Sequence, residues 1–361
     1  MPEKLKDIFF TSESVGQLAD HIAAAYPDFV RQQFLGLVFD EAWESRELKD
    51  RMRHVAQCLH EALPQHYPTA LEILEKVAPS IRGFETISLP EFVGRYGLGH
   101  WDLSLPALAF FTRFGSSEYG IRPFLKQDPE RAIEYMLRWA GDENEHVRRL
   151  ASEGCRPRLP WGMGLVAFKK DPSLILPVLE KLQDDESEYV RKSVANNLND
   201  ISKDHPDVVL DTCKRWYGQS KRTDWIVRRA LRTLLKSGNR RALLLFGFAD
   251  PTDIHVENLT LDRHRMPIGD VLHYSFQLRV DSEEPSKVRL ELGVDYVKKR
   301  GQLSRKLFAI KEDTFAPGTH VMSRSVGFAD QSTRKHNPGE HHIAIIVNGV
   351  EKATASFELA P

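Results

Sequence analysis

The sequence predicts a chain of two domains, an all-α repeat solenoid over residues 1–247 and a C-terminal all-β sandwich over residues 248–361. Three observations predict this. Helix-like apolar periodicity runs to about residue 240, one helical pattern recurs at a spacing near 40 residues, and the remaining chain changes to short alternating runs between turn residues. A length of 361 residues also suits two domains better than one.

The first part of the chain shows a series of amphipathic helices. Apolar residues at mixed spacings of three and four run through residues 15–39, where Pro27 is expected to separate two helices. A later helix is expected to begin with Asp128 as its cap and Pro129 at its first helical position. Further helices are expected over residues 48–63, 66–78 and 129–140.

A recurring segment defines the repeat. The segments GDENEHVRRLASEG, QDDESEYVRKSVANN and, more loosely, KRTDWIVRRALRTLL align on a Val-Arg-basic core at Val147, Val190 and Val227, which are 43 and 37 residues apart. Apolar or small residues follow each valine at the third and fourth positions, on the same helical face. A two-helix unit with this period is typical of HEAT-like α-solenoids, whose stacked units bury a continuous core and present one repeated face.

That repeated face is basic. It carries the pairs Arg148/Arg149, Arg191/Lys192 and Arg228/Arg229. Between residues 146 and 241 there are 20 Lys and Arg against 12 Asp and Glu, a local charge of +8 in a chain whose net charge is −1. This excess indicates a surface that binds a polyanion. Solvated helix faces that happen to be rich in arginine are the alternative explanation.

The C-terminal part is expected to form an immunoglobulin-like sandwich. Six or seven short strands are expected in about 110 residues, with turn chemistry between them, and Asn348-Gly349 is a strong signal for a tight hairpin. The segment carries no catalytic motif of its own. Its basic loops at 298–306 and 332–337 could contact a nucleic acid, but the residues alone favour a solvated hairpin tip.

Composition indicates a cytoplasmic protein. The N-terminus lacks the pattern of a secretory signal. Nowhere do eighteen or more apolar residues follow one another, so we expect no membrane span. The three cysteines, Cys58, Cys155 and Cys213, have no metal-binding spacing and are expected to be reduced thiols. The histidines also lack ligand spacing, so we expect no metal and no cofactor.

The segment SEGCRPRLPWG, residues 152–162, is the most unusual stretch of the chain. Pro157 and Pro160 are expected to end a helix and fix an extended path, so that Arg156, Arg158 and Trp161 project from a loop beside the basic face. Trp161 could then offer its aromatic face to a cationic or π-rich ligand. Alternatively, Trp161 fills a gap between repeats, because large aromatic side chains are usually buried.

Three acidic residues lie near this basic surface in the sequence pattern. Glu153 could pair with Arg149 four positions earlier, Asp200 ends the second repeat helix, and Glu118 could start a turn. Each has an ordinary structural explanation alone. Together, carboxylates on a polyanion-binding surface suggest a transition state that develops positive charge, as an oxocarbenium-like sugar does in glycosidic cleavage.

The runs EHVRRLASEGCRPRLPWG, YVRKSVANNLNDISKDHP and SSEYGIRPF resemble the AlkC branch of the AlkC/AlkD-type alkylpurine DNA glycosylases, which are bacterial HEAT-like repeat proteins. The resemblance is most specific over residues 115–235. It extends to the C-terminal part, because AlkC-type proteins carry an immunoglobulin-like module. It implies excision of cationic N3-alkylated bases from duplex DNA in base excision repair, without deep base flipping, by a monomeric enzyme that needs no small-molecule cofactor.

The resemblance also implies roles for individual residues. Asp200 would be the principal catalytic carboxylate, with Glu118 and Glu153 as acidic partners and Trp161 as the aromatic contact to the sugar or base. The implied phosphate contacts are Arg148, Arg156, Arg158, Arg191 and Lys192. A base such as 3-methyladenine or 3-methylcytosine is already a cationic leaving group, so its protonation is unnecessary. The enzyme would then only have to stabilise the developing sugar cation and position water as the nucleophile. A non-enzymatic HEAT-repeat scaffold that binds DNA or protein is the alternative, and a peptide-binding solenoid is a third possibility.

Overall fold

The computed structural model describes residues 5–330 and 335–361. The chain divides into two compact units, Met1–Ala230 and Leu231–Pro361. The predicted boundary at residue 247 falls where helices give way to strands, and α16 and α17 group with the β unit by their packing. Residues 332–334 of the second basic loop expected in the C-terminal part lie outside the described residues. No helix within the described residues has the length and apolar character needed to cross a bilayer.

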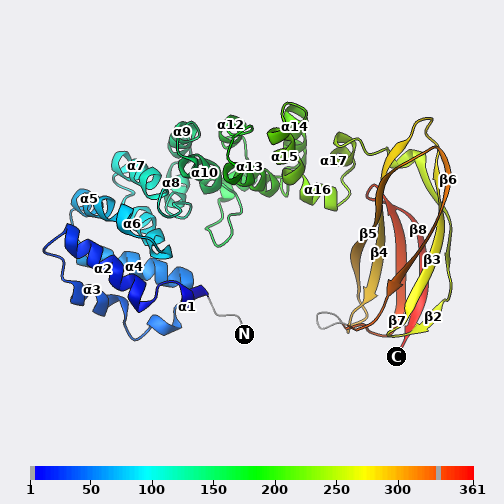
Figure 1. Cartoon of the computed structure of the whole chain (residues 1–361), viewed down its shortest axis with the longest axis horizontal. Helices are drawn as coiled ribbons and strands as arrows, with labels where there is room; N and C mark the ends of the chain where they lie inside the picture. Colours follow the sequence, from blue (N-terminus) through cyan, green and yellow to red (C-terminus); the bar gives the residue numbers. More distant parts are fainter. Residues whose placement is uncertain (1–4, 331–334) are drawn as a thin grey trace. The chain divides into compact units, whose positions relative to one another are not determined.

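The first unit is a stack of helices (Figure 1). One series of neighbours runs through α4, α6 and α8, and a later series runs through α10, α13 and α15. The helices of this unit are α1 (Leu5–Ile8), α2 (Ser12–Ala25), α3 (Arg31–Val38), α4 (Leu48–Ala62), α5 (Tyr67–Val77), α6 (Ser88–Tyr96), α7 (Trp101–Phe111), α8 (Arg122–Gln127), α9 (Pro129–Trp139), α10 (Glu145–Gly154), α11 (Val166–Lys170), α12 (Leu176–Lys181), α13 (Glu188–Ile201), α14 (Pro206–Trp216) and α15 (Lys221–Ala230). The second unit begins with α16 (Arg232–Lys236) and α17 (Arg240–Leu245).

The predicted helix boundaries have visible local causes. Asp128 accepts a hydrogen bond from the Arg131 amide at 3.0 Å, and Pro129 opens α9, as expected from the sequence. Asn144 caps α10 in the same way through the His146 amide. The chain leaves the helical conformation between α2 and α3 around Pro27, so the expected separation there is confirmed.

The aligned repeat positions form the core between α10, α13 and α15. Val147, Val190 and Val227 are all fully buried. Buried polar groups add specific links between successive repeats: Ser152 donates to Ser193 at 2.7 Å, and the Asn197 side chain donates to the Ser152 carbonyl at 2.8 Å. The unusual run VANNLND therefore holds neighbouring repeats in register, because a buried amide must find hydrogen-bond partners.

The second unit contains an immunoglobulin-like sandwich. One sheet has the strand order β1-β3-β6 and the other has the order β2-β8-β7-β4-β5. The strands are β1 (Ile254–Leu261), β2 (Arg265–Pro267), β3 (Val271–Val280), β4 (Ser286–Val297), β5 (Leu303–Phe315), β6 (Gly318–Gly327), β7 (Gly339–Val347) and β8 (Val350–Ala360). The expected count of six or seven is too low for the described residues, because β2 has three residues and shows no readable alternation.

The predicted hairpin at Asn348-Gly349 is confirmed. It joins β7 to β8, and both residues have positive φ, 46° and 79°, as the tight hairpin turn requires. Gly349 is also packed against Gly238, where a built Cβ would lie 2.1 Å from the opposite Cα. A side chain at either glycine would therefore push the β7–β8 turn away from the loop between α16 and α17.

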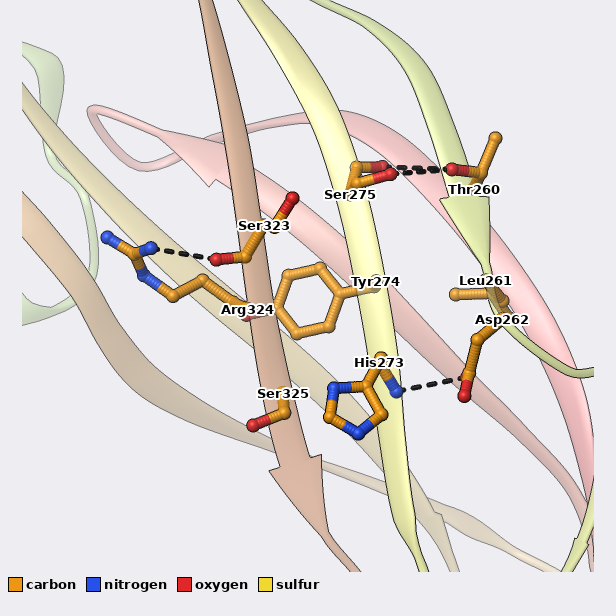
Figure 2. A pocket seen from close by; sticks show the side chains of 9 residues that line it. All are labelled: Thr260, Leu261, Asp262, His273, Tyr274, Ser275, Ser323, Arg324 and Ser325. Atoms are coloured by element: carbon orange, nitrogen blue, oxygen red, sulfur yellow. Dashed lines mark hydrogen bonds between the residues drawn. The ribbon is translucent and has the colours of Figure 1, made fainter.

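A shallow polar hollow lies on the three-stranded sheet (Figure 2). One pair of its hydroxyl groups interacts across strands, Thr260 with Ser275 at 2.8 Å. The His273 amide donates to Asp262 at 3.0 Å. These contacts lie within the sheet itself, so the hollow is a feature of the sheet surface.

Candidate active site

Three acidic residues that are far apart in the sequence meet in one cluster of the first unit. Glu118 pairs with Arg149 at 2.7 Å, and Arg149 lies 3.4 Å from Glu153. Arg156 then bridges Glu153 at 2.6 Å and Asp200 at 2.9 Å. The structure thus brings together Glu118, Glu153 and Asp200, the three acidic residues singled out in the sequence, within an alternating chain of ion pairs.

Helix ends place these carboxylates. Glu153 lies in the last turn of α10 and Asp200 in the last turn of α13, while Glu118 lies in the loop between α7 and α8. A carboxylate at a helix C-terminus meets the negative end of the helix dipole, which is unfavourable. Arg156 compensates for this at both helix ends, and Lys203 lies 3.3 Å from the second oxygen of Asp200.

The two bridging arginines remain charged despite their burial. Burial acts to lower the pKa of Arg156, but the charges of Glu153 and Asp200 outweigh it, so its pKa is raised overall. The pKa of Arg149 is raised in the same way, with Glu153 and Glu118 as the compensating charges. A buried charge is tolerable only when it is paired and hydrogen-bonded, and both arginines meet this condition.

Two tyrosines border the acidic cluster. Arg149 lies 5.0 Å from the Tyr189 ring centroid, a cation–π arrangement. Burial, followed by the charge of Glu118 and a side-chain hydrogen bond with it, raises the pKa of Tyr119. Tyr119 therefore stays protonated and marks the Glu118 end of the cluster.

Arg122 anchors the loop after α10 through hydrogen bonds to backbone carbonyls. This fully buried side chain donates to the carbonyls of Gly154 at 2.9 Å and Arg156 at 3.1 Å, and its Nε donates to the Met163 carbonyl at 2.6 Å. Burial lowers the pKa of Arg122 to about 10, which still leaves it charged at neutral pH. The loop folds as turns closed by the Leu165 amide on the Pro157 carbonyl, so the expected extended path is wrong.

Trp161 stands on this loop with 60% of its surface exposed, so it does not fill a gap between repeats. Its φ is +59°, in the left-handed region that residues other than glycine rarely adopt. Such a conformation costs free energy and persists only where the surroundings hold it. Lys49 from α4 donates to the Trp161 carbonyl. An exposed tryptophan in a constrained backbone is suited to contact a ligand.

The predicted phosphate contacts occupy different environments. Arg148 is 9% exposed and binds Asp185 through two hydrogen bonds, at 2.7 and 3.1 Å, and it also donates to the Asp142 and Glu143 carbonyls. Arg156 is 7% exposed, so the expectation that it projects from the loop is wrong. Both residues are engaged within the protein, and their role as phosphate contacts stays a prediction.

The remaining three predicted contacts lie nearer the surface. Arg158 pairs with Asp204 at 2.7 Å, and Lys192 pairs with Glu188 at 2.7 Å on an exposed helix face. Arg191 donates to the carbonyls of Asp185 and Glu186. Exposed ion pairs contribute little to stability, and the role of Arg158, Arg191 and Lys192 as phosphate contacts stays a prediction.

Four further residues of the site escaped sequence reasoning: Lys49, Tyr119, Arg122 and Lys203. Tyr119 and Lys203 lie beside or one turn from a singled-out acidic residue, and that proximity could have suggested them. Lys49 and Arg122 act on the loop from 112 and 41 residues away, at distances where no local pattern signals contact. Among the described residues, no group of three or more His, Cys, Asp or Glu side chains could hold a metal ion.

Comparisons with known proteins agree with this architecture. Residues 112–234 match the family described as "DNA alkylation repair enzyme", and residues 255–361 match the family described as "Uncharacterised protein YhaZ, C-terminal Ig-like domain". The Bacillus subtilis (strain 168) protein YhaZ is 46% identical over 356 residues, which cover 98% of this chain and 99% of that protein.

A solved structure gives the same result. The Pseudomonas fluorescens alkylpurine DNA glycosylase AlkC, bound to DNA containing an abasic site analog, matches with a TM-score of 0.82 and 38% identity, covering 100% of both chains. The fold, the family match and the similarity to AlkC together identify the chain as a DNA alkylation repair enzyme built on HEAT-like repeats. Within that class, the chain belongs to the AlkC-type alkylpurine DNA glycosylase family.

Proposed function

We propose that this protein excises cationic N3-alkylated bases from duplex DNA by hydrolysing the N-glycosidic bond. 3-Methyladenine is the main substrate that we propose. 3-Methylcytosine carries the same charge and is proposed as a further substrate. One observation carries the proposal: three carboxylates from separate elements converge in one cluster beside a loop that exposes Trp161. The enzyme is proposed to be monofunctional and to avoid deep base flipping.

The chemistry follows from the charge of the substrate. An N3-alkylated base leaves as a neutral molecule, so no acid is needed to protonate it, and the positive charge that develops lies on the sugar. The Asp200 carboxylate can stabilise that charge and orient the attacking water. Trp161 can add attraction between its ring and the cationic base or sugar. No step in this scheme needs a metal or a cofactor.

Access to Asp200 depends on Lys203. The Asp200 side chain is buried, one of its oxygens is bound by Arg156, and Lys203, which is 43% exposed, covers the other. A DNA phosphate would compete for the Lys203 ammonium group and free the carboxylate oxygen for the sugar. Phosphate binding would therefore activate the carboxylate at the place where the backbone passes.

The Asp200→Asn variant tests the proposed role of the carboxylate. It keeps the side-chain shape but removes the charge, so release of 3-methyladenine from methylated duplex should slow on the order of a hundredfold or more. Affinity for undamaged duplex should not fall, because the change removes a negative charge that competes with phosphate for Lys203. The matched control is Asp204→Asn, which removes a nearby acid that pairs with Arg158 and should leave the rate unchanged. A normal excision rate in a correctly folded Asp200→Asn protein would contradict the assignment.

A non-enzymatic scaffold that binds DNA or protein remains the second candidate. One observation favours it: each of the three acidic residues is already paired with an arginine or lysine. The scaffold predicts no abasic sites in methylated DNA and tolerance of substitutions at Asp200. A peptide-binding solenoid, the third candidate, predicts no salt-dependent affinity for DNA.

The cellular setting is also a proposal. We propose that the protein acts as a monomer in the cytoplasm, on alkylated double-stranded DNA of the nucleoid. The three cysteines are unpaired and buried, which suits a reducing compartment. Sedimentation of the purified protein, alone and with duplex DNA, would measure the stoichiometry directly.

A further inference from the structure

Lys49 connects the two ends of the candidate active site. It lies in the first turn of α4, where its ammonium group donates to the Trp161 carbonyl and lies 4.6 Å from the Tyr119 ring centroid. Burial lowers the pKa of Lys49. A half-buried lysine that bridges two segments is tolerable because the carbonyl oxygen and the aromatic face both stabilise its charge.

Tyr119 carries this contact on to the acidic cluster. Tyr119 follows Glu118 directly in the chain, and the charge of Glu118 acts on the Tyr119 hydroxyl group. Glu118 binds Arg149, and Arg149 approaches Glu153. One cation therefore touches the carbonyl of the exposed tryptophan on one side and the neighbour of a cluster carboxylate on the other.

The loop needs such an anchor at Trp161. The left-handed backbone of Trp161 is unfavourable for a residue with a Cβ, so external contacts must hold it. Arg122 binds the carbonyls of Gly154, Arg156 and Met163. Lys49 binds the carbonyl of Trp161, which lies between Arg156 and Met163 in the sequence. Removal of Lys49 would release the peptide that carries the tryptophan while the base of the loop stays fixed.

Resting on the proposed glycosylase function, we propose that Lys49 is a positioning residue that sets the Trp161 ring relative to Glu118 and the acidic cluster. Its effect on the reaction passes through Trp161. A displacement of about 1 Å of a positioned group can cost on the order of a hundredfold in rate. A direct phosphate contact by Lys49 is the competing role, and it makes the opposite prediction for combined variants.

A mutant cycle separates the two roles. The full-length variants are Lys49→Met, Lys49→Arg, Trp161→Ala and the combined Lys49→Met/Trp161→Ala, each assayed by single-turnover release of 3-methyladenine from methylated duplex. Lys49→Met and Trp161→Ala should each slow release on the order of tenfold or more. The combined variant should be within about threefold of Trp161→Ala, because the lysine has nothing left to position. Lys49→Arg keeps the charge and the donor, and should stay within about threefold of the unchanged protein.

Two controls separate the positioning role of Lys49 from a general effect of losing a lysine. Lys76→Met removes an exposed lysine that pairs with Glu72, and should leave both rate and affinity unchanged. Affinity for undamaged duplex should also be unaffected by Lys49→Met. The proposal would be overturned if the fold-reductions in rate of the two single variants multiply in the combined variant. A Lys49→Arg protein as slow as Lys49→Met would also overturn it.

Hydrogen exchange gives a readout that needs no activity. The amides of residues 158, 159 and 161–165 should exchange faster in Lys49→Met than in Lys49→Arg, because only the first loses the bond to the Trp161 carbonyl. Equal exchange in the two variants would overturn the positioning role even if the protein released no base at all. Absence of base release by the unchanged protein, with the expected exchange difference, would instead count against the proposed function.

Discussion

At the scale of single residues, partners decide what a basic side chain can do. Arg148 and Lys192 belong to the Val-Arg-basic cores of two repeats, at the first and second positions after the valine, and were both expected to contact phosphates. Arg148 binds Asp185 through two hydrogen bonds in a buried pair, whereas Lys192 forms an exposed pair with Glu188 within its own helix. The first basic position of the repeated core is therefore engaged in the fold at Arg148, whereas the second is open to solvent at Lys192.

This contrast predicts different effects of Arg148→Met and Lys192→Met. Loss of Arg148 leaves Asp185 buried without its partner, so the free energy of unfolding should fall by about 3 kcal/mol. Lys192→Met should leave the stability unchanged but reduce the salt dependence of DNA affinity by about one unit of slope in log K against log salt. Urea unfolding and fluorescence anisotropy at several salt concentrations measure these two effects. A reversed pattern would contradict the roles that burial gives the two residues.

Sequence reasoning identified the catalytic candidates at this scale better than their supports. Glu118, Glu153 and Asp200 were singled out and do lie together, and Glu153 does approach Arg149 as the spacing of four residues predicted. Arg122 and Lys49 were missed. Their contacts are with backbone carbonyls of a distant loop, and a carbonyl carries no signature in the sequence.

At the scale of elements, the end of α10 positions the site. Gly154 is the last residue of this helix, next to Glu153, and packs against Ile121 and Met136. A Cβ built on Gly154 would lie 2.7 Å from Ile121 Cγ2 and 2.9 Å from Met136 Cε. Such contacts are too close, so the helix end or its neighbours must move.

We therefore expect Gly154→Ala to destabilise the protein by about 1–3 kcal/mol and to slow base release through displacement of Glu153. The matched control is Gly36→Ala in α3, where a built Cβ meets nothing within 4 Å. That change should be neutral or stabilise by about 0.5–1 kcal/mol, because alanine favours the helix. Chemical denaturation curves of both variants check the prediction, and a stable, fully active Gly154→Ala protein would contradict it.

Elements with strong local signals were predictable, and elements defined by tertiary contacts were not. The Asp128-Pro129 start of α9 and the Asn348-Gly349 turn were both identified from their chemistry. Strand β2 was not, because three residues paired in parallel with β8 carry no alternating pattern. The turns after α10 also escaped prediction, since Arg122 and not the prolines alone fixes their path.

At the scale of the whole molecule, the chain belongs to a DNA repair family and its repeats assemble the candidate site. The acidic cluster draws on the α7–α8 loop, α10 and α13, so it forms only when successive repeats stack. We propose that this cluster breaks the N-glycosidic bond of a cationic base. Binding DNA alone would not require three carboxylates on a surface meant for phosphates.

Direct measurement of base release tests that claim. Purified full-length protein is incubated with N-methylated duplex DNA, and released bases and abasic sites are quantified over time beside the Asp200→Asn protein. We expect release of 3-methyladenine with one abasic site per base, and the loss of this release in the variant. Salt-dependent binding of the same DNA with no released base, or equal release by both proteins, would contradict it.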